Sequence, residues 1–234
     1  MTHDGYSRSV TYVTLRSVQG WELFSGLPEA ELRRVLAVAR RRKFDRREVV
    51  FHRGDPADTL HLVSQGRFAV RVTTQLGETA TIGVHGTGEA FGELALVEPG
   101  SARSTTVTAL EPSETFALHR DDFERLRQTF PSVNDVLVRL LGGRLRRASE
   151  LLVEALFTPA EIRVRRRLLE LSALYRGHAV PLSQQELADI AGTSRATVNR
   201  VLRSEAERGA VELRRGQTLV VDRDDLARRA SLPS

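Results

Sequence analysis

The spacing of apolar residues changes twice along this chain, and no single regular element fits all three patterns. In residues 21–44 apolar side chains recur every three or four positions, as in an amphipathic helix, at Leu32, Val35, Leu36 and Ala39. Residues 48–119 break into short runs between turn formers, and from about residue 131 the helical spacing returns. We therefore expect an opening helical segment, a β-rich unit and a long helix.

The β-rich unit is predicted to be antiparallel. Its runs are EVVF, TLHLVS, RFAVRVTT, TATIGV, TTVTAL and ETFALH. In RFAVRVTT, Phe68, Val70 and Val72 alternate with Arg71 and Thr73, which is the period of a strand with one buried face. Short strands joined by turns favour a compact sandwich or barrel.

The long helix carries one narrow apolar stripe, formed by Val138, Leu141, Leu145, Ala148, Leu152 and Ala155. Such a stripe suits a second helix in a homodimer, although packing on the chain's own β unit has the same spacing. Gly142 and Gly143 interrupt it at a cost of about 1 kcal/mol each relative to Ala. This pair indicates either a close contact or a conditionally ordered helix. We place a hinge at Thr158–Pro159, since the residue before proline disfavours helix.

Residues 182–209, LSQQELADIAGTSRATVNRVLRSEAERG, predict a helix-turn-helix. Ser183 and Glu186 form a capping-box pattern, Gly192 suits a tight turn, and Thr193 or Ser194 is placed to cap a second helix. The second helix turns its valines inward. Its outward polar side chains suit base recognition in a DNA major groove.

The candidate DNA-binding residues follow from this arrangement. VELRRGQTLVV predicts a hairpin that serves as a wing near the phosphates. The predicted DNA-contacting set is Ser194, Arg195, Ala196, Asn199, Arg200 and Arg215.

Residues 91–104, FGELALVEPGSARS, present one arginine ten residues after a Gly-Glu-Leu turn and no catalytic constellation. Glu89 and Glu93 lie too near one turn, without a base or nucleophile, to indicate an enzyme. The histidines show no metal-ligand spacing, so we expect no metal site.

Composition excludes several classes of protein. The absence of cysteine excludes disulfides and thiolate metal sites. No apolar run reaches the roughly 20 residues of a membrane span, and the first residues lack a signal-peptide layout, so we expect a cytoplasmic protein without membrane contact. Residues 160–234 hold 14 arginines against 10 acidic residues, whereas residues 1–159 hold 21 basic and 20 acidic ones. The C-terminal third is therefore the expected anion-binding part.

With these motifs in order, the chain resembles the cAMP receptor protein/FNR family of bacterial transcription regulators from Trp21 to about Arg229. The resemblance implies an α+β fold with an N-terminal cyclic-nucleotide-binding-type antiparallel β-roll, a long dimerisation helix and a C-terminal winged helix-turn-helix. The corresponding boundaries are residues 1–20 for an extension, 21–130, 131–158 and 159–234.

The resemblance also implies a cyclic nucleotide, cAMP first and cGMP or another nucleotide as alternatives. Arg103 would pair with its phosphate, and Ser104 and the amides near Glu93 and Leu94 would donate hydrogen bonds. Glu93 would accept from the ribose hydroxyl, and Gly92 would permit close approach of the backbone. A ligand-independent regulator in which Glu93 and Arg103 pair with each other is the alternative function.

Three departures from the family pattern affect what is carried over. The family's Thr-Ser pair that contacts the purine falls on Ala148 and Ser149, so only Ser149 is left to reach a partner's nucleotide. Ala196 replaces a base-reading glutamate, which predicts an altered half-site in a palindromic operator. The stretch YRGHAVP is shorter than the one that leads to the family's RNA polymerase contact, so activation, repression and a different polymerase contact all stay open.

Overall fold

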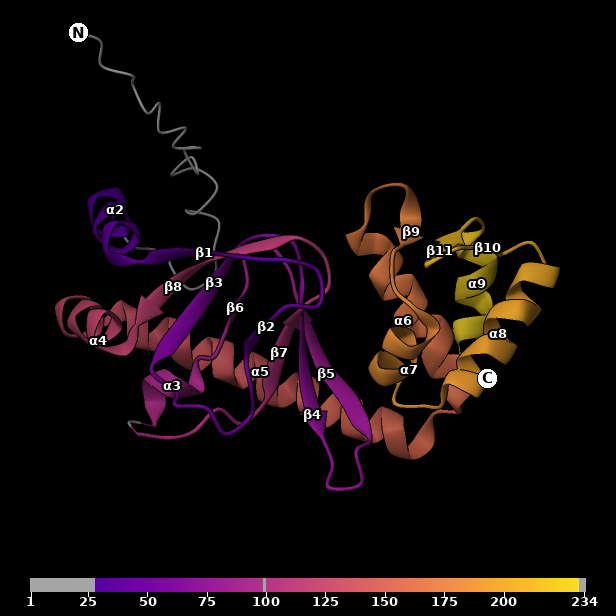
Figure 1. Ribbon diagram of the computed structural model, residues 1–234, viewed down its shortest axis with the longest axis horizontal. Coiled ribbons are helices and arrows are strands. Elements are labelled where there is room, and N and C mark those ends of the chain that lie inside the picture. The colour runs from indigo at the N-terminus through magenta and orange to yellow at the C-terminus, as the bar shows by residue number, and fades with distance from the viewer. Residues whose placement is uncertain (1–27, 99, 232–234) are drawn as a thin grey trace, which may run out of the picture.

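The computed structural model describes residues 28–98 and 100–231. Figure 1 shows two lobes, a β-roll with short helices around it and a smaller, mostly helical lobe, joined by the long helix α5 (Ser132–Phe157). No helix in these ranges is both long and apolar enough to cross a membrane.

The β-roll consists of two four-stranded antiparallel sheets with the orders β1-β8-β3-β6 and β2-β7-β4-β5. All six predicted strand runs are confirmed, and two strands that were not predicted, β1 and β6, complete the sheets. The strands are β1 (Arg40–Phe44), β2 (Val49–Phe51), β3 (Thr59–Gln65), β4 (Phe68–Thr73), β5 (Thr79–His85), β6 (Ala90–Phe91), β7 (Thr106–Ala109) and β8 (Ser113–His119).

Phenylalanines from both sheets fill the space between them. Phe44 and Phe68 meet edge to face with ring centroids 5.6 Å apart, and Phe68 and Phe91 lie 5.0 Å apart. His61 stacks on Phe91, also at 5.0 Å, and burial lowers its pKa to about 3. A neutral imidazole therefore belongs to this apolar core.

The expected helix over residues 21–44 is wrong at its C-terminal end, and its first residues lie outside the described ranges. Helix α2 (Glu29–Val38) ends two residues before β1 begins. In β1 the side chains of Arg40 to Lys43 are exposed and only Phe44 is buried, so the apolar period ends before this strand. Pairing with β8 then decides its conformation, and Arg41 contacts Glu114 across the strands.

Helices α3 (Leu94–Val97) and α4 (Arg120–Thr129) pack at the end of the roll where α5 begins, and α4 was not predicted. Val133, Val136 and Leu137 of α5 are buried in the same cluster as Leu60 and Leu62 of β3. The first turns of α5 are thus part of the roll's own core.

The apolar stripe of α5 mostly does not pack on the roll. Val138, Leu145 and Leu152 are 68%, 71% and 61% exposed, and among the stripe residues Leu141 packs against the roll's core cluster. Gly142 and Gly143 lie in one continuous helix, with open space where a side chain would stand. Packing of the stripe on the chain's own β unit, one of the two expectations, therefore holds for Leu141 but not for the exposed Val138, Leu145 and Leu152.

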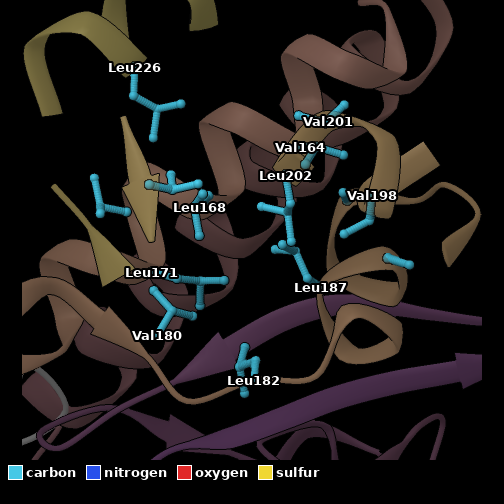
Figure 2. Packing of buried hydrophobic residues seen from close by; sticks show 14 of the residues in the cluster. Val164, Leu168, Leu171, Val180, Leu182, Leu187, Val198, Val201, Leu202 and Leu226 are labelled. Carbon is cyan, nitrogen blue, oxygen red and sulfur yellow. The ribbon is translucent and has the colours of Figure 1, made fainter. Parts of the chain in front are cut away.

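The C-terminal lobe is a winged helix-turn-helix, as predicted. Its sheet has the order β10-β11-β9. Figure 2 shows its core, in which Leu168, Leu187, Leu202 and Leu226 converge. The elements are α6 (Ala160–Leu174), a 3₁₀ turn η2 (Arg176–His178), β9 (Ala179–Val180), α7 (Gln184–Ala191), α8 (Arg195–Glu207), β10 (Val211–Arg214), β11 (Gln217–Val220) and α9 (Arg223–Ala230).

The predicted signals of the helix-turn-helix are each present. The Ser183 hydroxyl accepts from the Glu186 amide while the Glu186 carboxylate accepts from the Ser183 amide, which completes the capping box. Gly192 ends α7 with φ +60°, the left-handed region that favours glycine. Ser194 caps α8 by accepting from the Thr197 amide.

The two lobes are docked through turns at one end of the roll. The Arg67 guanidinium lies 4.1 Å from the centroid of the Tyr175 ring, donates to Glu111 at 2.7 Å and also donates to the Leu174 carbonyl. Arg46 donates to the Pro181 carbonyl at 2.8 Å. These contacts hold the C-terminal end of α6 and the entry to α7 against the roll.

The turn between β6 and α3 depends on a glycine. Gly92 has φ +81°, and a Cβ there would lie 2.7 Å from Arg103 Nη1 and 3.0 Å from the Thr59 carbonyl oxygen. The backbone therefore passes so close to Arg103 that only glycine fits.

We expect Arg67→Met to lower the free energy of unfolding by about 1–3 kcal/mol, because it removes an ion pair with Glu111 within the roll, and a hydrogen bond and a cation–π contact between the lobes. Urea unfolding followed by circular dichroism, with limited proteolysis at the 158–159 link, measures this. Arg33→Met is the matched control, since Arg33 forms an exposed pair within α2. Equal stability of the two variants contradicts the prediction.

We expect Gly92→Ala to lower the free energy of unfolding by more than Gly77→Ala does, by at least about 1 kcal/mol. Gly77 also has positive φ, at +84°, but has nothing within 4 Å of an added Cβ. Gly77→Ala therefore measures only the cost of placing an alanine at positive φ. The difference between the urea-unfolding free energies of the two variants measures the contact of the added Cβ with Arg103 and Thr59. Indistinguishable losses show that the contact is not tight.

Candidate ligand pocket and nucleic-acid interface

A cavity of about 900 Å³ lies between the roll, α5 and the helix-turn-helix lobe. Its walls include β5, the β6–α3 turn and the middle of α5, and its far end reaches α6 and α7. Five of the predicted ligand residues, which stand in two separate turns, line this one cavity: Gly92, Glu93, Leu94, Arg103 and Ser104.

Arg103 is a buried cation without a carboxylate in close contact. Its side chain is 5% exposed, its guanidinium lies 4.1 Å from the centroid of the Phe51 ring, and the Asp58 carboxylate stands 4.0 Å away. One weak hydrogen bond, 3.4 Å long, runs from Nη1 to the Gly92 carbonyl, and the buried Nε has no partner. Burial lowers the pKa of Arg103, against the opposing effect of Asp58, Asp55 and Glu93. Since arginine stays protonated in proteins, the site favours an added anion.

Glu93 does not pair with Arg103, which corrects the pairing expected for a ligand-independent pocket. Its Oε2 lies 2.6 Å from Nη1 of Arg144 on α5, and Arg144 also donates to the Ala90 carbonyl. The carboxylate therefore connects the β6–α3 turn to the long helix. Sequence analysis missed Arg144, because it is one of several arginines in α5 and nothing in its spacing marks it.

The positions that depart from the family pattern lie differently in the structure. Ala148 lines the cavity, whereas Ser149 is exposed, does not line it, and donates from its hydroxyl to the Leu145 carbonyl of its own helix at 3.0 Å. Within this chain the α5 wall of the cavity is therefore apolar next to Ala148, with Leu141 and Leu145 beside it.

The described residues contain no group of three or more histidine and carboxylate side chains arranged to hold a metal ion. His85 lies 3.5 Å from Glu89, and Glu89 accepts from the Gly86 amide at 2.7 Å. These interactions engage the side chains of His85 and Glu89 on the cavity wall.

The first turn of α8 presents Arg195 and Ala196 to solvent. Asn199 is half-buried, and its Oδ1 accepts from the Gln184 amide of α7 at 3.3 Å. Arg200 is exposed and lies 2.8 Å from Glu161 at the start of α6; the Glu161 backbone amide and Arg200 lower the pKa of Glu161. Arg195 and Asn199 are thus brought close to α7, whereas Arg200 is tied to α6.

A second cavity, of about 470 Å³, lies beside α8 between the start of α7 and the wing. Gln184, Arg195 and Gln217 line it. Arg215 is exposed at the turn between β10 and β11, next to Gly216 with φ +76°. Arg214 pairs with Glu212 at 2.8 Å, so its charge is already balanced by a neighbour. Of the arginines predicted to contact DNA, Arg195 and Arg215 are exposed beside α8 and the wing without an ion-pair partner among the described residues.

Each of the two lobes matches a known domain family. Residues 41–130 match the cyclic nucleotide-binding domain, and residues 162–229 match the Crp-like helix-turn-helix domain. The cyclic AMP receptor protein of Thermus thermophilus is 37% identical over 84% of this chain and 90% of its own. A CRP-like cAMP-activated global transcriptional regulator of Mycobacterium tuberculosis is 31% identical, over 80% and 86%.

Among solved structures, the c-di-GMP responsive global regulator CLP of Xanthomonas campestris superposes with a TM-score of 0.72 at 25% identity, covering 82% of this chain and 99% of that one. The catabolite activator protein of Thermus thermophilus gives 0.53 at 36% identity, over 89% and 98%. These relatives are transcription regulators rather than enzymes, and their matches span both lobes. The chain belongs to the Crp/Fnr family of DNA-binding transcription regulators, with a cyclic nucleotide-binding domain and a Crp-like helix-turn-helix.

Proposed function

We propose that this protein is a homodimeric regulator whose affinity for a palindromic operator is set by a cyclic nucleotide bound in the β-roll, with cAMP as the first candidate. The observation that carries the proposal is Arg103, a buried guanidinium with an unpartnered Nε in a cavity of about 900 Å³. A cyclic nucleotide brings a single phosphodiester charge, which is what this cation lacks.

The groups around Arg103 fit the rest of such a ligand. Glu93 uses Oε2 for Arg144 and keeps Oε1 as an acceptor for a ribose hydroxyl. Ser104 is exposed in the cavity and offers a hydroxyl near the phosphate position. Gly92 brings the backbone of the β6–α3 turn close to the same place. Phosphate, sugar and backbone contacts are therefore available together.

The relatives described as cAMP receptor and cAMP-activated proteins favour cAMP. Ala148 lacks the hydroxyl that the family uses on the purine, so cGMP and other nucleotides stay candidates. A contact of Ser149 with a partner's nucleotide remains a proposal, since in one chain it lies on the exposed side of α5.

The exposed stripe on α5 is proposed as the dimer seam. Val138, Leu145 and Leu152 would pack against the same residues of a second copy, and Gly142 with Gly143 would let the two helices approach closely. Binding to adjacent major grooves then requires the two copies of α8 to stand about 34 Å apart. A ligand that changes α5 packing changes this separation.

A ligand-independent regulator with an empty pocket is the second candidate. The Glu93–Arg103 pair that would make such a pocket self-sufficient is replaced by Glu93–Arg144, and this difference favours the ligand-gated function. Contacts with RNA polymerase stay an untested expectation.

We expect Arg103→Leu to weaken binding of cAMP or cGMP by about 10- to 100-fold, because a charge-assisted interaction with the phosphate is lost. The fold should persist, since the variant removes a buried charge. Isothermal titration calorimetry of both nucleotides measures the effect. Arg125→Leu, at a 74% exposed side chain on α4, is the control and should bind as the parent does. A parent protein that binds DNA but neither nucleotide supports the ligand-independent candidate instead.

We expect Arg195→Ala to weaken specific operator binding by about 1–3 kcal/mol while nucleotide binding is unchanged, since Arg195 stands on the exposed first turn of α8. Fluorescence anisotropy with operator and random DNA, at one salt concentration, measures the loss. Arg125→Ala again serves as the control because α4 lies on the other lobe. If Arg195→Ala weakens operator and random DNA equally, Arg195 contacts phosphate rather than bases.

A further inference from the structure

Thr81 is a buried hydroxyl without a partner in the wall of the ligand cavity. It lies in the middle of β5, is 9% exposed, and its Oγ1 has no hydrogen-bond partner. A buried polar group left unpaired lowers the stability of a protein, and natural structures contain few of them. The hydroxyl at this position therefore calls for an explanation.

The placement of Thr81 connects it with Arg103. Both residues line the same cavity, and each has a buried polar atom without a partner, Oγ1 in Thr81 and Nε in Arg103. Gly83, two residues further along β5, also lines the cavity, and the His85 ring lies 3.3 Å from where its Cβ would stand. Two unsatisfied groups in one cavity indicate two polar contacts on one ligand.

Several other polar groups of the cavity are already engaged. Glu93 contacts Arg144, and His85 and Glu89 contact each other. On the α5 wall Leu141, Leu145 and Ala148 offer no side-chain hydrogen bond. Among the described residues of this cavity, Thr81 Oγ1 and Arg103 Nε are thus the side-chain polar atoms that are buried without a partner, and Thr81 is the one available for the part of the ligand away from the phosphate.

We propose that Thr81 recognises the heterocyclic base of the bound nucleotide through its hydroxyl, and so determines ligand preference where the family's hydroxyl at Ala148 is missing. A hydroxyl donates one hydrogen bond and also accepts, so it pairs with a ring nitrogen, an amino group or a carbonyl group of a purine. This inference rests on the proposed function, because it assigns the second contact of the same ligand.

The test is Thr81→Val, which keeps the shape of the side chain and removes the hydroxyl. We expect about tenfold weaker binding of the preferred nucleotide, cAMP or cGMP, by calorimetry, whereas Thr81→Ser stays within about threefold. Without ligand, Thr81→Val should unfold at the same temperature as the parent or higher, since it removes an unpaired buried group.

The control is Thr115→Val, at a fully buried threonine whose Oγ1 does have a partner, the Nδ1 of His61 at 3.1 Å. It should show the opposite pattern, a lower unfolding temperature with unchanged nucleotide affinity.

Equal affinity of the parent and Thr81→Val for the nucleotide overturns the role of Thr81 but leaves the proposed function intact. A lower unfolding temperature of unliganded Thr81→Val also overturns it, because the hydroxyl would then have a partner within the protein. A parent that binds neither cAMP nor cGMP removes the proposed function and this inference together.

Discussion

The positive charge of Arg103 lies inside the β-roll, and the arrangement around it follows from that burial. Removing a guanidinium from water is costly unless ions or hydrogen bonds replace the solvent. Phe51 supplies a ring face at 4.1 Å and the Gly92 carbonyl a weak hydrogen bond, but Asp58 stays 4.0 Å away and Glu93 turns to Arg144. The Arg103 charge is thus only partly compensated within the protein, and an anionic ligand would compensate it further. Gly92 is part of this arrangement, because a side chain there would displace the guanidinium.

Sequence analysis predicted much of the fold because local signals and long-range packing agree there. Short sequence patterns determine the conformation at these places. They are the capping box at Ser183 and Glu186, the left-handed Gly192, and the alternation of Phe68, Val70 and Val72. The prediction of a helix at residues 40–44 was wrong because the apolar period of α2 ends just before them. Their extended conformation comes from pairing with β8. Helix α4 was missed because β8 runs directly into it, with no break between His119 and Arg120 to separate the two elements.

The candidate site was predicted only in part. The residues that were predicted lie close together in the sequence, whereas those that were missed lie far from them. Gly92, Glu93 and Arg103 lie within one short segment whose motif is visible in sequence. Arg144 and Thr81 belong to the same cavity but stand on α5 and β5, and only the folded structure shows that Arg144 pairs with Glu93 and that the Thr81 hydroxyl has no partner. The spacing of residues in the sequence does not show which side chains pair and which polar atoms are left without a partner after folding. Ser149 shows the converse, since family likeness named it while the structure of one chain leaves it outside the cavity.

Coupling between the pocket and the DNA-binding lobe, which the proposed function implies, can be carried by packed side chains and ion pairs. Such contacts lie in the middle of α5 and near its C-terminal end. In the middle Glu93 binds Arg144, and near the C-terminal end Glu154 binds Arg166 at 3.1 Å and also the buried Arg167 of α6. The α5–α6 junction at Thr158–Pro159 is therefore bridged by side chains although its backbone is not helical. Under the proposed function, a shift of α5 relative to the roll would reach α6 through Glu154, and the recognition helix through their shared core, in which Val164 and Leu168 pack with Val198 and Leu202. Arg167 is buried and also pairs with Glu170 of its own helix at 2.5 Å, so Glu154 joins α5 to a buried arginine that α6 already holds in place.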